Sequence, residues 1–258
     1  MRWLSNAESC LRLHNGVVKK KKQGVNRPSV ARVFVTVAVL ALAVWMFLPQ
    51  ILNGFTSGRP IQIDASASEP LRQLASLEVA EGGSLGDAPP YSRDQFGDGW
   101  ADLDADGCNT RNEILARDLD HLDFGSDTQD CVVQAGTLED PYTDSTIVFQ
   151  RGEQTSAAVQ IDHVVALANG WQAGAWKWSN EDRLRFANDP LNLLAVEGNA
   201  NQAKGAASAD QWLPDNKAYR CDYAARQVAV KYKWSLTVTR NEQKTLNDIL
   251  KNCPSITF

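Results

Sequence analysis

Histidine is scarce in this chain: only His14, His121 and His163 occur among 258 residues, so the place of each needs a reason. The five cysteines include no CxxC spacing, which argues against a zinc-thiolate site. The sequence also has no internal repeat. With 43% apolar residues, its length allows one folded domain plus additional segments.

Basic residues are in short supply outside the N-terminal segment. Residues 1–52 hold eight of the 26 Lys and Arg and one of the 31 Asp and Glu. The remainder therefore carries 18 basic and 30 acidic residues, a formal charge of −12. Such a domain is not a general nucleic-acid-binding protein, because general binding needs a basic surface that neutralises phosphates.

The longest apolar run lies near the N-terminus. No residue from Val33 to Gly58 is charged, and the run VFVTVAVLALAVWMFL can span about 30 Å of hydrocarbon as a helix. Basic residues precede it and no basic run follows. The positive-inside rule therefore predicts a cytoplasmic head over residues 1–32, a transmembrane signal-anchor over 33–52 and an extracellular remainder.

A cleaved signal peptide is the alternative. The first small-x-small site, Ala65-Ser66-Ala67, lies well past the apolar core, so we favour an uncleaved, single-pass anchor. Either interpretation places the folded domain outside the cytoplasmic membrane, as a membrane-attached or a secreted protein.

Four of the cysteines fall in the exported part, an even number in an oxidising compartment. Three pairings are possible. We favour Cys108–Cys131 and Cys221–Cys253 because both are local, and four buried free thiols remain the alternative.

The segment 53–90, rich in Ala, Ser, Gly and Pro, predicts a flexible linker, although residues 71–77 form a short amphipathic piece. The folded domain is expected over 91–258. Periodicity and capping patterns predict an α+β domain that is mostly helical, with a small β element in its middle. The expected helices are 112–122, 183–187, 199–212, 219–234 and 239–250, and the expected strands are 146–152, 157–164 and 191–196.

Polar residues gather around two of these strands. Asp162 and His163 end one, in the stretch VQIDHVVALANGW, and Asn192 begins the other. Asn201 and Lys204 follow on the next helix. A carboxylate and an amide oxygen can hold a hard divalent cation, and a neutral imidazole can take a proton from water. Phosphodiester hydrolysis requires this combination, and one histidine suffices for it.

The segments QIDHVVAL, DPLNLLAV and NANQAKG resemble the three parts of the HNH, or ββα-metal (His-Me finger), endonucleases. The region from Tyr91 to Cys253 looks most like exported bacterial HNH endonuclease family proteins, relatives of the C-terminal nuclease domain of GmrSD-type restriction enzymes. GCNTRNEILARDL, DPYT, WLPDNKAYRC and the cysteines add to the likeness. The resemblance implies a disulfide-stapled helical domain around a small ββα-metal core.

The resemblance also implies residue roles. His163 would be the general base, Asp162 a metal ligand, and Asn192 the residue that fixes the loop and the histidine. Asn201 stands where many relatives have histidine, and its amide oxygen suits Mg²⁺ or Mn²⁺ better than zinc or nickel. Lys204 would contact the phosphate or the transition state, the alternative being a solvated surface lysine. For Asp162 and His163 the alternative is a buried histidine satisfied by its neighbour.

The segment between the two strands is longer than the compact motif needs. We therefore interpret residues 171–188 as an insertion between the strands. We assign its Trp171, Trp176 and Trp178 to the core rather than to substrate stacking.

A second metal site is suggested by DLDADGCNTRNE, residues 102–113, which matches the EF-hand loop pattern and would bind a structural Ca²⁺. Cys108 and Asn109 at the seventh and eighth loop positions, and glycines before the loop, favour an Asp-rich turn instead. The pattern's ligands are Asp102, Asp104, Asp106 and Glu113.

Together these features predict an HNH-type, metal-dependent endonuclease outside the cytoplasmic membrane that cleaves nucleic acid, DNA above all. Nothing indicates an oligomer, so we expect a monomer. Two alternatives stay open: an inactive, disulfide-stabilised envelope binding module on the same fold, and a hydrolase of a phosphodiester other than DNA.

Overall fold

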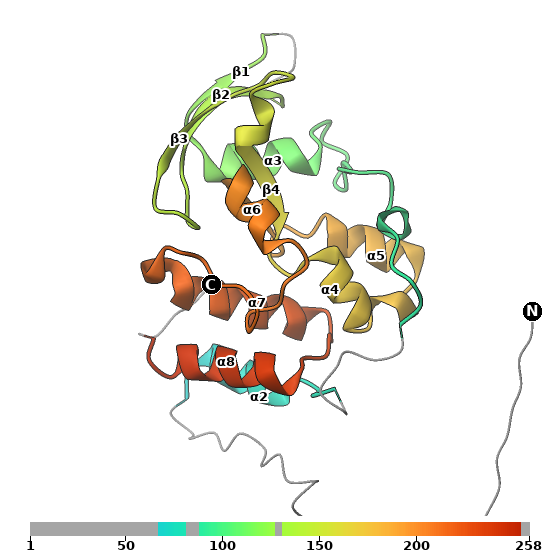
Figure 1. The fold of residues 1–258 in the computed structure, drawn as a ribbon. Helices are drawn as coiled ribbons and strands as arrows, with labels where there is room; N and C mark the ends of the chain where they lie inside the picture. Colours follow the sequence, from blue (N-terminus) through green and yellow to red (C-terminus); the bar gives the residue numbers. More distant parts are fainter. Residues whose placement is uncertain (1–66, 81–87, 127–130, 254–258) are drawn as a thin grey trace, which may run out of the picture. The chain divides into compact units, whose positions relative to one another are not determined.

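The computed structural model describes residues 67–80, 88–126 and 131–253 (Figure 1). The predicted head, 1–32, and anchor, 33–52, lie outside these ranges. In the described part, no helix has the length and apolar character needed to cross a membrane.

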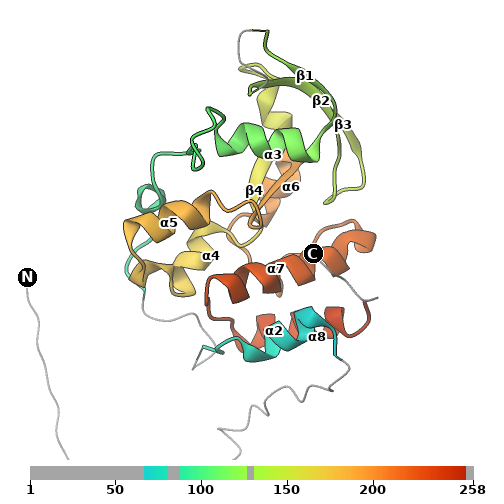
Figure 2. The same ribbon diagram turned by 180° about the vertical axis from the view of Figure 1, so that it is seen from behind.

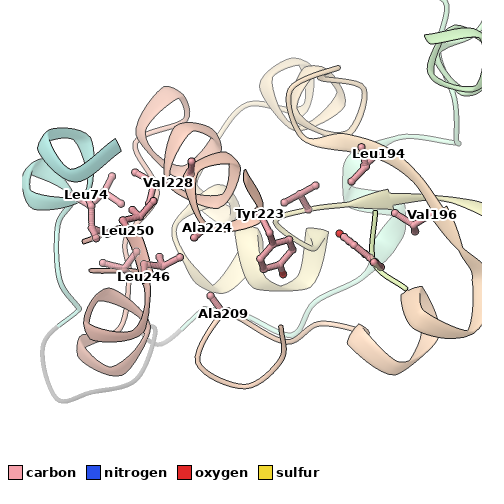
Figure 3. Packing of buried hydrophobic residues seen from close by; sticks show 14 residues of the cluster. Leu74, Leu194, Val196, Ala209, Tyr223, Ala224, Val228, Leu246 and Leu250 are labelled. Carbon is pink, nitrogen blue, oxygen red and sulfur yellow. The ribbon is translucent and has the colours of Figure 1, made fainter. Parts of the chain in front are cut away.

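Three helices pack together at one end of the domain. α7 (Arg220–Lys233) and α8 (Arg240–Leu250) form a pair, and α2 (Glu69–Ser76) lies against both, as the two views show (Figures 1 and 2). α8 begins where Thr239 caps it, since the Thr239 side chain accepts a hydrogen bond from the backbone N–H of Glu242. The apolar side chains between these helices continue to Leu194 and Val196 of a central strand (Figure 3).

Part of the segment 53–90, which we expected to be a flexible linker, is folded. Leu74 and Leu77 are buried in the same cluster, and Val79 forms a parallel bridge with Val238. The amphipathic piece is therefore part of the folded domain, because α7 and α8 supply an apolar surface that covers its leucines. The domain begins before Tyr91.

A three-stranded antiparallel sheet lies at the other end of the domain, with the order β1 (Asp120–Phe124), β2 (Val133–Glu139), β3 (Thr146–Gln150). The expected helix 112–122 is wrong in its last residues. α3 (Thr110–Asp118) ends at Asp118, and Leu119 is already extended. The chain then pairs with β2, so backbone pairing across the sheet overrides the helical spacing of Leu119 and Leu122.

The centre of the domain is an antiparallel pair, β4 (Val159–His163) and β5 (Leu193–Glu197), followed directly by α6 (Gly198–Lys204). His163 lies opposite Leu193, and Asn192 precedes β5 by one residue. The segment between the strands folds as α4 (Leu167–Gln172), η4 (Ala175–Lys177) and α5 (Asn180–Ala187).

The tryptophans of this segment lie in or against the core, as we expected. Trp171 is buried, and Trp176 and Trp178 pack on the same apolar cluster. Short 3-10 turns complete the domain: η2 (Arg93–Phe96), η3 (Ser156–Ala158) and η5 (Lys217–Tyr219).

Both expected disulfides form, Cys108–Cys131 and Cys221–Cys253. The first ties the loop before α3 to the segment just before β2, and the second ties α7 to the segment just after α8. The α+β class and the two disulfides are thereby confirmed.

Candidate active site

His163 ends β4 with its ring almost wholly buried, and its Nε2 lies 2.8 Å from the carbonyl oxygen of Ala187. A carbonyl only accepts, so Nε2 carries the hydrogen and Nδ1 is the basic nitrogen of the neutral ring. Burial lowers the pKa of His163 to about 3; the bond to Ala187 opposes this, and the charges of Arg93 and Lys204 add to it. The ring is therefore neutral at pH 7.

Trp100 covers one face of this ring. The two ring centroids are 5.7 Å apart and the planes differ by 7°. The residue that follows, Ala101, donates its N–H to the Oδ1 atom of Asn188 at 2.9 Å, which fixes the loop that carries the indole. Sequence reasoning missed Trp100, since it lies 63 positions before His163 and no local pattern links the two.

Both carboxylate oxygens of Asp162 accept hydrogen bonds. The Tyr142 hydroxyl donates to Oδ2 at 2.6 Å and Lys204 Nζ to Oδ1 at 2.9 Å, with all three side chains buried. Burial raises the pKa of Asp162, and the Lys204 charge and both hydrogen bonds act in the opposite direction. Lys204 also donates to the carbonyl oxygen of His163 at 2.9 Å. This lysine is an interior residue, not a solvated one.

Asn192 fixes the chain just after the histidine. Its Oδ1 accepts from the N–H of Val165 at 2.8 Å, and its Nδ2 donates to the carbonyl of Val165 at 3.2 Å. Its own carbonyl accepts from the N–H of Val164. The side chain is fully buried, so its two bonds hold the turn that follows β4.

Asn201 projects from α6 towards β4, where its Nδ2 donates to Oε1 of Gln160 at 2.9 Å. This bond uses the amide nitrogen and leaves Oδ1 as the donor atom for a cation. Gln160 thereby orients the Asn201 amide so that its oxygen, not its nitrogen, is available to a cation.

Asp162, His163 and Asn201 border one pocket of about 390 Å³. Its polar lining includes Arg93, Gln160, Asp162, His163, Asn201 and Gln202. The structure thus brings three of the five predicted site residues to one cavity, and Asn192 and Lys204 contact their neighbours from the buried interior. Arg93, like Tyr142 and Trp100, is a site residue that sequence reasoning missed.

The donors of this pocket fit a hard divalent cation. Asp162 and Asn201 offer a carboxylate and an amide oxygen, and the described lining contains no cysteine and no second histidine, which a zinc or nickel site would favour. Mg²⁺ commonly takes one or two protein oxygens and completes its shell with water and substrate phosphate. Each oxygen of Asp162 keeps a further lone pair beside its present donor. Because Lys204 already offsets the carboxylate charge, we expect weak metal binding.

The Asp-rich loop is a separate feature. One oxygen from each of Asp102, Asp104 and Asp106 lies within 4.8 Å of the others, and all three residues are exposed. Burial and the charges of these aspartates raise the pKa of Glu113. However, Asp102 and Asp106 also accept N–H groups of the loop itself, from Gly107 and Cys108, as an Asp-rich turn does. The calcium site stays a prediction.

Residues 109–249 match the family model of the C-terminal domain of GmrSD restriction endonucleases. The chain belongs to this family. It is also similar to an "uncharacterized secreted protein" of Arthroderma benhamiae, with 36% identity over 190 residues that cover 73% of this chain and 86% of that protein. No solved structure matches it. Membership of the GmrSD C-terminal domain family confirms the resemblance noted from the sequence and indicates a nuclease.

Proposed function

We propose that this member of the GmrSD C-terminal domain family is an HNH-type, metal-dependent endonuclease that hydrolyses phosphodiester bonds of DNA outside the cytoplasmic membrane. The observation that carries the proposal is the pocket at the end of β4. There a neutral histidine with a defined basic nitrogen lies beside a carboxylate and an amide oxygen. The order of two antiparallel strands and a helix, β4, β5 and α6, supports the assignment to the ββα-metal type.

His163 acts as the general base. Nδ1 takes a proton from the attacking water, the water oxygen bonds to phosphorus, and the bond to the leaving sugar oxygen breaks as that oxygen gains a proton from solvent. Burial keeps the ring unprotonated at pH 7 and also lowers its basicity, while the Nε2–Ala187 bond holds the ring in the tautomer that this step needs. Trp100 limits rotation of the ring.

Asp162 and Asn201 hold the divalent cation, Mg²⁺ or Mn²⁺, which when bound would stabilise negative charge on the phosphate and the leaving oxygen. Asn192 fixes the turn behind His163. Lys204, which the resemblance assigns to the phosphate, instead orients Asp162 and the end of β4, because its ammonium group is bound by both.

Export is part of the proposal. The secreted relative and the two disulfides support a location outside the cytoplasmic membrane. We propose that residues 33–52 anchor the chain in the membrane as a single span with residues 1–32 in the cytoplasm, and that the domain acts as a monomer.

The test is plasmid cleavage by the full-length chain, purified in detergent, with Mg²⁺, Mn²⁺ or EDTA. His163→Ala is compared with His121→Ala, which removes an exposed histidine on β1. Metal-dependent nicking that His163→Ala abolishes and His121→Ala retains is the expected result. Equal background nicking by the unchanged protein and both variants would contradict DNA cleavage. It would favour the inactive binding module or another phosphodiester substrate.

A further inference from the structure

The active-site pocket contains one basic side chain. Among the described residues that line it, Arg93 alone is a lysine or arginine, and the other polar groups, apart from Asp162 and His163, are neutral. The same arginine also lines the small hollow between Trp100, His163 and Ala187. Arg93 therefore lines both of these cavities together with His163.

The guanidinium group of Arg93 is available to a ligand. The residue is exposed, and within the described ranges it forms no ion pair and donates no side-chain hydrogen bond. Lys204 cannot serve in its place, because it is 1% exposed and its ammonium group is bound to Asp162 and His163. Among the described residues, Arg93 is therefore the Lys or Arg side chain that a phosphate in the pocket can contact.

The backbone that carries Arg93 is fixed. In η2, Phe96 is buried against Trp171 and Phe186, and Arg183 donates its Nε–H to the carbonyl of Gln95 at 2.8 Å. Because buried contacts fix the backbone of η2, the exposed side chain of Arg93 can bind a ligand at the pocket with little loss of backbone freedom.

We infer that Arg93 binds a phosphate group of the nucleic-acid substrate next to His163. The inference rests on the proposed function for the position of the substrate. It deepens that function, since Arg93 lies outside the segment that matches the family model, residues 109–249. A planar guanidinium can donate two parallel hydrogen bonds to a phosphate, which a lysine cannot. In a domain of net negative charge, this contact carries an unusual share of the attraction to the backbone of the substrate.

The experiment measures DNA binding without cleavage. A fluorescent duplex is titrated with the full-length chain in EDTA at several KCl concentrations, for the unchanged protein, Arg93→Gln and Arg93→Lys. Arg185→Gln is the control, since Arg185 is an exposed arginine of α5 that pairs with Glu181.

Arg93→Gln should weaken binding by about tenfold or more, as expected for a charge-assisted hydrogen bond to phosphate. It should also lower the slope of log affinity against log salt by about 0.9. Arg93→Lys should keep the slope and lose part of the affinity, while Arg185→Gln should change neither.

Cleavage by the same proteins separates the two claims. If the protein nicks DNA but Arg93→Gln binds and cuts like Arg185→Gln, the inference is overturned and the nuclease stands. If no protein cleaves DNA but DNA binding still depends on Arg93, the phosphate contact is supported and the proposed DNA hydrolysis is contradicted. If the unchanged protein binds no DNA, the inference is overturned. Unfolding temperatures equal to that of the unchanged protein confirm that the exposed substitutions leave the fold intact.

Discussion

Lys204 Nζ lies 2.9 Å from Oδ1 of Asp162, and both side chains are buried at the end of β4. An ion pair in this position has lost its hydration, so it contributes to stability only while both partners and their other hydrogen bonds are present. Tyr142 on Oδ2 and the carbonyl of His163 on Nζ supply those bonds. The pair therefore connects α6 to the two residues that we place at the centre of the reaction.

Replacing Lys204 by methionine should cost about 3–5 kcal/mol of unfolding free energy, because it leaves the Asp162 carboxylate buried without its counter-charge. Urea denaturation measures this loss. The matched control is Lys244→Met, which breaks an exposed pair with Asp248 on α8 and should change stability little, because solvent screens that pair. The double variant Lys204→Met, Asp162→Asn should recover part of the loss. A Lys204→Met protein as stable as Lys244→Met would contradict the assigned role.

Replacing Tyr142 by phenylalanine tests whether this cluster orients Asp162 for a metal. The change removes one hydroxyl that donates to Oδ2 and keeps the buried ring. Loss of such an outer-shell donor typically costs about 10–100-fold in metal affinity or activity. We expect the metal concentration for half-maximal nicking to rise by about tenfold or more.

The control for this variant is Tyr219→Phe, whose ring packs on Tyr142 and whose hydroxyl interacts with Arg226. A purely structural role of Tyr142 would lower stability in both variants and leave the metal dependence of each unchanged.

The short-range features of this domain were predictable from the sequence. The caps at Ser179 and Thr239 each depend on two residues three positions apart. The two disulfides join cysteines 23 and 32 positions apart, and β4, β5 and α6 follow one another in the order that the sequence predicts. The positions of Asp162, His163 and Asn201 around one pocket follow from that strand–strand–helix order.

The parts that depend on contacts between distant segments were not predictable. Trp100 and Arg93 reach the site from segments before β4 whose own patterns give no sign of a site. Tyr142 lies in DPYT, which adds to the family resemblance, but nothing in that segment shows that its hydroxyl reaches Asp162. Lys204 is buried although lysines are rarely found inside a protein, and only its partners explain why. Similarly, the α2 leucines become core residues only because α7 and α8 present a surface to them.

His163 should make stability depend on pH. Its pKa falls from the usual value of about 6.5 in the unfolded chain to about 3 in the folded protein, because the ring is buried. Between these two values the unfolded state binds a proton that the folded state does not, so stability falls as pH falls from 6.5 towards 3. From pH 7.5 to 5.5 this group alone should remove about 1.4 kcal/mol. Urea denaturation at both pH values should show that loss in the unchanged protein and in His121→Gln, and lack it in His163→Gln. The same loss in all three proteins would mean that other groups cause the pH dependence and that the His163 ring is not held neutral by burial.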